Sequence, residues 1–168
     1  MVSSGLLSDI TTSIQLLAKA LGEIPTGEKI VLRFQSDIKK IKAGARTRPK
    51  RKIFLELSDN PLMTVGKNTF LNDAATLVGA ENIYAENSIH YPKPSWEDVI
   101  NKNPEVIIFF AMNDNPAKFT RVEKSWVRFP FLSAVKNRKI RTLTSDSLLR
   151  PTPRIIEGLK VLEKAIYE

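Results

Sequence analysis

Residues 104–111 read PEVIIFFA, an apolar run of strand length that starts with a proline. A strand with one face in water alternates apolar and polar side chains, but this run has no polar position after Glu105. Such a run is typical of a strand covered on both faces, as in a parallel sheet. It therefore predicts the centre of an α/β domain.

Strand-like and helical patterns alternate on both sides of this run. The other expected strands are residues 52–57, 81–85 and 139–144, and the expected helices are residues 68–79, 95–103, 117–126, 130–137 and 152–168. Thr69 or Asn68 can cap the first of these helices and Ser95 the second. The alternation predicts a three-layer α/β sandwich with a mostly parallel central sheet.

The front of the chain has a different pattern. Residues 6–21 and 28–43 carry apolar side chains at steps of three and four, which is typical of amphipathic helices. Gly22 and Pro25 should separate the two helices, and Gly44 should end the second. We expect residues 1–47 to form a helical region and residues 48–168 to form the α/β domain.

Composition limits the kinds of site that the chain can hold. Its 168 residues, 42% of them hydrophobic, are enough for one domain with a real core. It has no cysteine and one histidine, which excludes a disulfide framework and a cysteine-ligated metal site. We therefore predict no metal site and no cofactor.

The net charge of +8 would allow an anionic partner. Its densest basic run is ARTRPKRK, residues 45–52, which lacks interleaved aromatic residues and any recognition helix. We interpret it as a solvated linker and expect no nucleic-acid partner. A basic interaction domain remains the alternative.

Two features bear on the cellular location. No run approaches the ~20 apolar residues of a membrane span. The first residues, MVSSGLLSDITT, lack the basic start and the clean apolar segment of a signal peptide, so we expect none in this chain.

Four polar loops should meet at one edge of the sheet, because ligands of open α/β sheets usually lie outside the carboxyl ends of the strands. They are residues 58–66, 90–94, 111–117 and 145–154. Asp59, Asp114 and Asp146 could serve an enzyme there, which is a second alternative. However, the chain has no phosphate-binding GxxxxGK[ST], no GxGxxG and no GxSxG motif.

The order of four longer stretches resembles a known family. They are residues 60–86 (NPLMTVGKNTFLNDAATLVGAENIYAE), 91–109 (YPKPSWEDVINKNPEVIIF), 126–146 (WVRFPFLSAVKNRKIRTLTSD) and 150–167 (RPTPRIIEGLKVLEKAIY). In this order and spacing they resemble the C-terminal lobe of ABC-importer substrate-binding proteins of the cobalamin and ferric-siderophore type. In that family two α/β lobes are joined by a long helix.

The resemblance implies a binding protein and not an enzyme. Its ligand would be an iron complex (a siderophore or haem) or cobalamin, and its protein partner an ABC permease. The family's N-terminal lobe is missing here, and the full-length protein would be extracytoplasmic. Apolar surface left by that lobe would also favour a homodimer.

The resemblance also implies the site residues. The ligand would contact the cleft loops, through Pro61, Met63, Tyr91, Asn113, Asp146 and Arg150. Tyr91 would stack on the ligand and Arg150 would face an anionic group. Glu97 would dock on basic residues of the permease. Leu149 departs from the polar residue that some cobalamin binders have.

Overall fold

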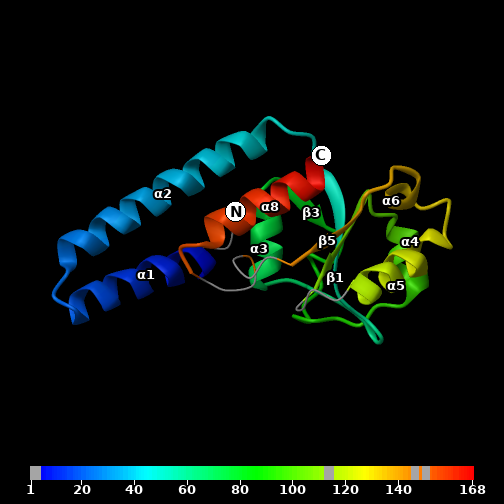
Figure 1. Ribbon diagram of the computed structural model, residues 1–168, viewed down its shortest axis with the longest axis horizontal. Helices are drawn as coiled ribbons and strands as arrows, with labels where there is room; N and C mark the ends of the chain where they lie inside the picture. Colours follow the sequence, from blue (N-terminus) through cyan, green and yellow to red (C-terminus); the bar gives the residue numbers. More distant parts are fainter. Residues whose placement is uncertain (1–4, 112–115, 145–147, 149–151) are drawn as a thin grey trace.

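The computed structural model describes residues 5–111, 116–144, 148 and 152–168. A sheet lies between two layers of helices, and a pair of long helices extends away from it (Figure 1). The strands are β1 (Arg51–Asp59), β2 (Leu62–Thr64), β3 (Ala80–Asn82), β4 (Val106–Phe110) and β5 (Ile140–Leu143). The helices are α1 (Gly5–Ala20), α2 (Ile24–Arg46), α3 (Phe70–Leu77), α4 (Trp96–Lys102), α5 (Pro116–Val127), α6 (Ser133–Lys136) and α8 (Ile155–Tyr167).

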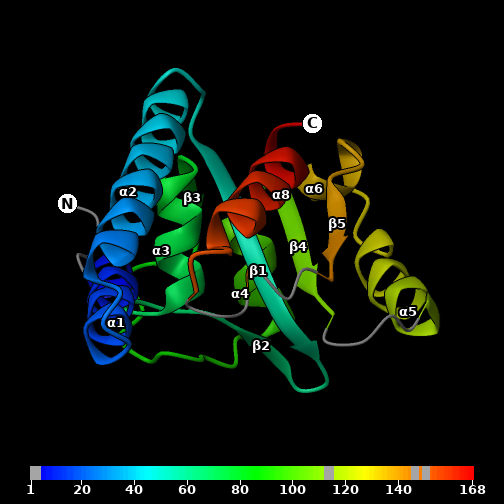
Figure 2. The ribbon, with the colours of Figure 1, turned by 60° about the vertical axis from the view of Figure 1, so that its left-hand side comes forward.

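The sheet is mostly parallel, as predicted. Its order is β2-β1-β4-β5, and β3 also pairs with β1. β1 runs parallel to β3 and β4, β4 runs parallel to β5, and β2 alone is antiparallel to β1 within the described strands. β1 and β4 therefore lie inside the sheet (Figure 2).

The central strands bury side chains on both faces. Ile108 of β4 belongs to a core that includes residues of α2, α3 and α8, whereas Ile107 and Phe109 belong to a core with residues of α4 and α5. All residues of β4 are buried. This is the double burial that the apolar run at 104–111 predicts.

Local capping agrees with the sequence pattern. The Thr69 hydroxyl accepts a hydrogen bond from the backbone N–H of Asn72, and the Ser95 hydroxyl accepts one from Asp98. These bonds satisfy N–H groups that the first turn of a helix leaves free. They fix where α3 and α4 begin.

Several expected boundaries were wrong. The strand expected at residues 81–85 is β3 at Ala80–Asn82, and the helix expected at residues 130–137 is α6 at Ser133–Lys136.

α2 begins at Ile24, not at residue 28, and continues past Gly44 to Arg46. Pro25 does not block it, because the first turn of a helix does not use the backbone N–H that proline lacks.

β2 was also missed, because its three residues lie inside the expected loop 58–66. It forms a hairpin with β1, in which Leu62 pairs with Asp59. The Thr64 hydroxyl donates to the carbonyl of Leu55 at 2.6 Å. A strand this short is too brief for alternation to reveal.

The basic linker is partly neutralised by the fold. Arg48 forms an ion pair with Glu163 of α8, and its guanidinium lies 5.2 Å from the ring centre of Tyr167. Arg51 pairs with Glu105 at 2.9 Å. These contacts tie the end of α2 and the start of β1 to the rest of the domain, which favours a structural role for these cations.

α1 and α2 form a helical hairpin that projects from the sheet (Figure 1). They pack tightly at Gly27, where an added Cβ would overlap the Cβ of Ala18. A larger side chain at this position must force the helices apart.

We expect Gly27→Leu to destabilise the protein by about 1–3 kcal/mol, the usual cost of overpacking. Urea unfolding would measure it, and hydrogen exchange should show the loss in α1 and the first turns of α2. Glu28→Leu, at the exposed neighbouring residue, is the matched control. Equal stability of the two variants would contradict the close packing of the hairpin.

Candidate functional site

Three parallel strands end at one edge of the sheet. Glu56 of β1 pairs with Phe109 of β4, and Phe110 pairs with Leu143 of β5. The chain leaves all three strands on the same side, and the β1–β2 hairpin extends beyond them (Figure 2). This edge is where the sequence predicts ligand-binding loops.

The loop that carries Tyr91 is fixed at this end. The backbone N–H of Thr64 donates to the carbonyl of Pro92 at 3.1 Å, and that of Gly66 donates to the carbonyl of His90 at 2.8 Å. Tyr91 lies between these two anchors, and 57% of it is exposed. The backbone on either side of Tyr91 is therefore held in place, while its side chain is exposed and can contact another molecule.

Other predicted residues lie close to this loop in the fold. Met63 is half-buried in β2, next to the residue that bonds Pro92, and Pro61 is exposed in the turn before it. The structure thus brings Pro61, Met63 and Tyr91 to one end of the sheet. Asn113, Asp114, Asp146 and Arg150 lie outside the described residues.

Asp59 forms an ion pair with Arg121 of α5. The carboxylate oxygen lies 2.7 Å from a guanidinium nitrogen, and the Asp59 side chain is 11% exposed. This pair joins the tip of β1 to α5. It gives Asp59 a structural role, as is common for aspartates in turns.

Sequence reasoning missed a buried carboxylate near this edge. Glu56 is fully buried in β1 and accepts a hydrogen bond of 2.7 Å from the indole N–H of Trp126. The signal was present as a single acid inside the apolar strand KIFLEL. Buried carboxylates need such donors, because burial without partners is costly.

A partly buried polar pair anchors α4. The Tyr84 hydroxyl donates to Asp98 at 2.5 Å. Burial and the bond to Asp98 raise the pKa of Tyr84 well above its usual range, so the ring stays neutral at physiological pH. Glu97, the preceding residue, is exposed in the same first turn.

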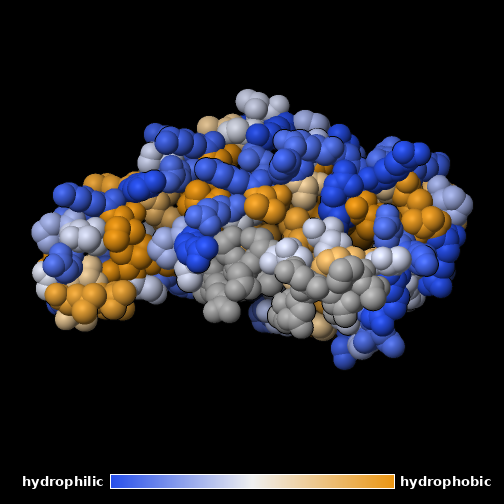
Figure 3. Space-filling model, viewed as in Figure 1, coloured by the Kyte–Doolittle hydropathy of each residue, from blue (hydrophilic) through white to orange (hydrophobic). Residues whose placement is uncertain are grey.

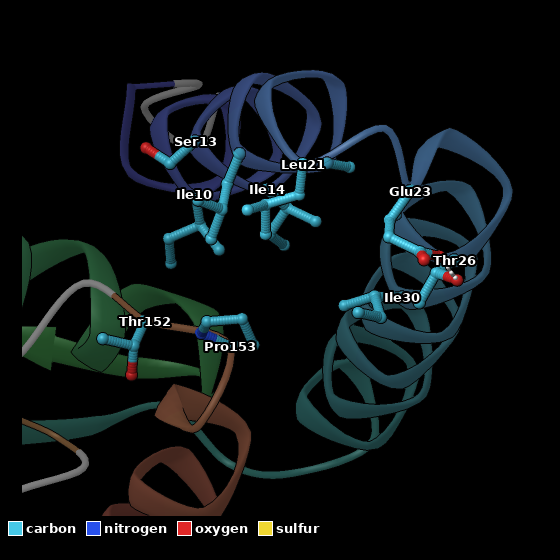
Figure 4. Close-up of a pocket in the computed structure, with 12 residues that line it drawn as sticks. Ile10, Ser13, Ile14, Leu21, Glu23, Thr26, Ile30, Thr152 and Pro153 are labelled. Atoms are coloured by element: carbon cyan, nitrogen blue, oxygen red, sulfur yellow. Dashed lines mark hydrogen bonds between the residues drawn. The ribbon is translucent and has the colours of Figure 1, made fainter.

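A separate apolar groove of about 460 Å³ lies between α1, α2 and Pro153. Ile14 of α1 and Ile30 of α2 face one another across it, and Pro153 closes its floor (Figure 4). Leu17 and Leu21 on its rim are 61% and 67% exposed. Figure 3 shows hydrophobic surface along one side of this hairpin, and contiguous exposed apolar surface of this kind often marks a binding site.

No group of three or more histidine, aspartate or glutamate side chains among the described residues could hold a metal ion. No helix in the part of the chain that the structure describes is long and apolar enough to cross a membrane.

The family model for periplasmic binding proteins matches residues 3–147 of this chain. The chain belongs to the periplasmic binding protein family. The match includes both helices of the hairpin and all five strands. The predicted family is therefore confirmed.

Curated relatives of this periplasmic binding protein cover nearly all of it. It is 29% identical over 160 residues to a vitamin B12-binding protein of Vibrio parahaemolyticus, covering 94% of this chain and 55% of the relative. It is 28% identical over 164 residues to an uncharacterised ABC transporter substrate-binding lipoprotein of Bacillus subtilis, covering 95% and 50%. The chain thus spans about half the length of the curated relatives it matches.

Solved structures confirm the fold of this periplasmic binding protein. A possible iron-binding periplasmic solute-binding protein of Staphylococcus epidermidis superposes with a TM-score of 0.84 at 27% identity, covering 96% of this chain and 63% of that one. The vitamin B12-binding protein of Vibrio cholerae gives 0.81 at 25% identity, covering 95% and 61%.

Proposed function

We propose that this chain is a ligand-binding lobe of an ABC-importer substrate-binding protein. Its ligand would be an iron complex, either a siderophore or haem, or cobalamin. The relatives named for vitamin B12 and iron support this range of ligands. The role is to hold the ligand, without chemical change, for a permease.

The observation that carries the proposal is the exposed side chain of Tyr91, on a loop whose backbone is anchored beside the carboxyl edge of a parallel sheet. A flat aromatic side chain suits a macrocycle or a catecholate, because both offer large faces for stacking. Pro61 and Met63 add apolar surface at the same end. Asn113, Asp146 and Arg150 would supply the polar contacts, with Arg150 facing an anionic group.

The same geometry gives less support to an enzyme. Asp59 is bound to Arg121, so it is not poised as an acid or base. The matching family is one of binding proteins. The sequence also lacks the GxSxG motif that presents a serine nucleophile in many α/β enzymes.

The apolar groove supports a second part of the proposal. We propose that it is covered by a preceding lobe, equivalent to the part of the curated relatives that this chain does not span. Residues 1–47 would then be the inter-lobe region and residues 48–168 the C-terminal lobe. Where such a lobe is absent, two copies of the chain would pair through the groove as a homodimer.

Glu97 would dock on basic residues of the permease. It is exposed, and its neighbour Asp98 is fixed by Tyr84, so the turn that presents it is rigid. A carboxylate on such a rim contributes orientation and partner choice more than affinity. The site of action would be extracytoplasmic, a location that the lipoprotein in the name of one relative supports.

The test is a calorimetric titration with a ferric siderophore, haemin and cyanocobalamin in turn. It should use this chain and the chain joined to the N-terminal half of a close relative. We expect one of the three ligands to bind, more tightly to the longer protein. No binding of any of them to either protein would contradict the transport proposal.

For the ligand that binds, Tyr91→Ala should raise the Kd about tenfold, since an aromatic stack is worth ~0.5–1.5 kcal/mol beyond its area. Tyr91→Phe keeps the ring and should leave the Kd nearly unchanged. An equal loss in both variants would assign the contact to the hydroxyl and not to the face of the ring.

A further inference from the structure

A cluster of aromatic rings and one arginine lies on the surface where α5 meets α4. Trp96 of α4 lies 4.5 Å from Trp126 and 6.0 Å from Phe129, measured between ring centres. Phe129 in turn lies 6.2 Å from Phe131. The rings form a continuous row from the buried core at Trp126 to the exposed Phe131.

Arg128 covers part of this row. Its guanidinium carbon lies 4.9 Å from the ring centre of Trp96 and 4.9 Å from that of Phe129. The side chain is exposed, so the guanidinium is held over two rings with its N–H groups open to solvent. A planar cation fixed in this way is ready to form paired hydrogen bonds with a carboxylate.

The exposed part of the cluster is unusually apolar for a surface. Phe131 is 57% exposed and Val127 is 51% exposed. Figure 3 shows hydrophobic surface at the end of the molecule that carries α5 and α6, bordered by hydrophilic atoms. Exposed aromatic residues around a fixed arginine have the composition of the centre of a protein–protein interface.

The cluster is continuous with Glu97, because Glu97 follows Trp96 in the first turn of α4. Trp96 lies on the flank of α4 that faces α5, while Asp98 lies on the flank that contacts Tyr84. The exposed Glu97 comes between them. The exposed Glu97 is thus next to Trp96 in the chain, and Trp96 carries the cation of Arg128 over its ring.

We propose that Arg128, with Trp96 beneath it, and the exposed Val127 and Phe131 form the centre of the surface that docks on the permease. This inference rests on the proposed function, which assigns Glu97 to the same partner. The permease surface would carry a carboxylate opposite Arg128, apolar side chains opposite Phe131 and a cation opposite Glu97. This charge pattern selects a protein partner over an anionic lipid surface, which Glu97 would repel.

The test uses the absence of cysteine in the chain. A single Glu28→Cys, at an exposed residue of α2, carries a dye. Figure 1 shows α2 on the opposite side of the molecule from α5. Binding is then measured to the cognate permease in nanodiscs, and to empty nanodiscs of the same lipids.

We expect Arg128→Glu and Phe131→Ser each to raise the Kd for the permease at least tenfold. Arg128→Lys should lose part of the affinity, because lysine keeps the charge but not the planar donor pair. The matched control is Leu32→Ser, at an apolar residue of α2 that is 65% exposed, and it should leave the Kd unchanged. Both test positions are exposed, so circular dichroism should show wild-type folding.

The remaining outcomes separate the two proposals. If Glu97→Gln weakens binding but the Arg128 and Phe131 variants do not, the cluster is not part of the docking surface and only the inference fails. If the wild-type chain does not bind, or no variant including Glu97→Gln changes the Kd, both the docking role and the inference are wrong. Binding to empty nanodiscs that is lost in Phe131→Ser would assign the cluster to a lipid surface and overturn the inference.

Discussion

Replacing Trp126 by alanine should cost about 3–5 kcal/mol of unfolding free energy, which is the range for deleting a large buried aromatic side chain. Trp126 is fully buried. Its ring centre lies 5.6 Å from that of Phe54 and 4.5 Å from that of Trp96, so its removal leaves a cavity between the sheet and α4. Domains of this size are stable by only ~5–15 kcal/mol, so a large share of the stability would be lost.

The loss has a second cause. The indole N–H of Trp126 donates to the fully buried Glu56, and alanine removes that donor. Trp126→Phe separates the two effects, since phenylalanine fills much of the space but cannot donate. We expect it to cost about 1–3 kcal/mol, the usual penalty for taking a partner from a buried polar group.

Urea unfolding followed by far-ultraviolet circular dichroism would measure both variants. Trp96→Ala is the matched control, because Trp96 is only partly buried and should cost less. Near-ultraviolet circular dichroism should lose the signal of the two neighbouring indoles in either tryptophan variant. A cost below about 1 kcal/mol for Trp126→Ala would contradict the packing described here.

Gly66→Ala should disturb both stability and ligand binding. A Cβ on Gly66 would overlap the carbonyl oxygen of Ile89 and lie 2.8 Å from that of Asn87. Both are backbone atoms, so the loop that carries Tyr91 must move away as a whole. The hydrogen bond from Gly66 to His90 and that from Lys67 to Asn87, each 2.8 Å, would be strained or lost.

We expect Gly66→Ala to lower the unfolding free energy by about 1–3 kcal/mol, as overpacking usually does. For the ligand identified by titration, its Kd should rise at least as much as in Tyr91→Ala, about tenfold, because the ring is displaced with the loop. The measurements are urea unfolding and calorimetric titration of the same preparation.

Gly44→Ala provides a control with the same chemical change. Gly44 lies within α2, and a Cβ there would make only ordinary contacts of 3.7 Å or more with Arg48. Alanine is the better helix former by roughly 0.5–1 kcal/mol, so this variant should be slightly more stable and bind ligand normally. If Gly66→Ala were as stable as the wild type and bound the ligand normally, the close contact between Gly66 and the loop would matter for neither stability nor binding.

The arrangement of layers could be predicted from the sequence, because it depends on local patterns. The apolar run at 104–111 requires cover on both faces, and the structure places β4 inside the sheet between two cores. The caps at Thr69 and Ser95 depend on residues three positions apart, so they too could be read directly. The order of the longer stretches was enough to predict the family.

Contacts between distant residues could not be predicted in this way. Arg121 and Asp59 are 62 residues apart in the chain, and Trp126 and Glu56 are 70 apart. Each pair meets only because α5 packs close to β1 in the fold. The three-residue β2 exists because β1 is beside it to accept its hydrogen bonds. Spacing along the chain fixes which residues share a face of one element, whereas contacts between elements depend on how those faces pack. For this reason the sequence by itself determined the layers and the edge where a ligand would bind. Only the tertiary structure decided that Asp59 is an ion-pair partner and that Arg128 lies over two rings. It also decided that Thr64 and Gly66 anchor the backbone on either side of Tyr91.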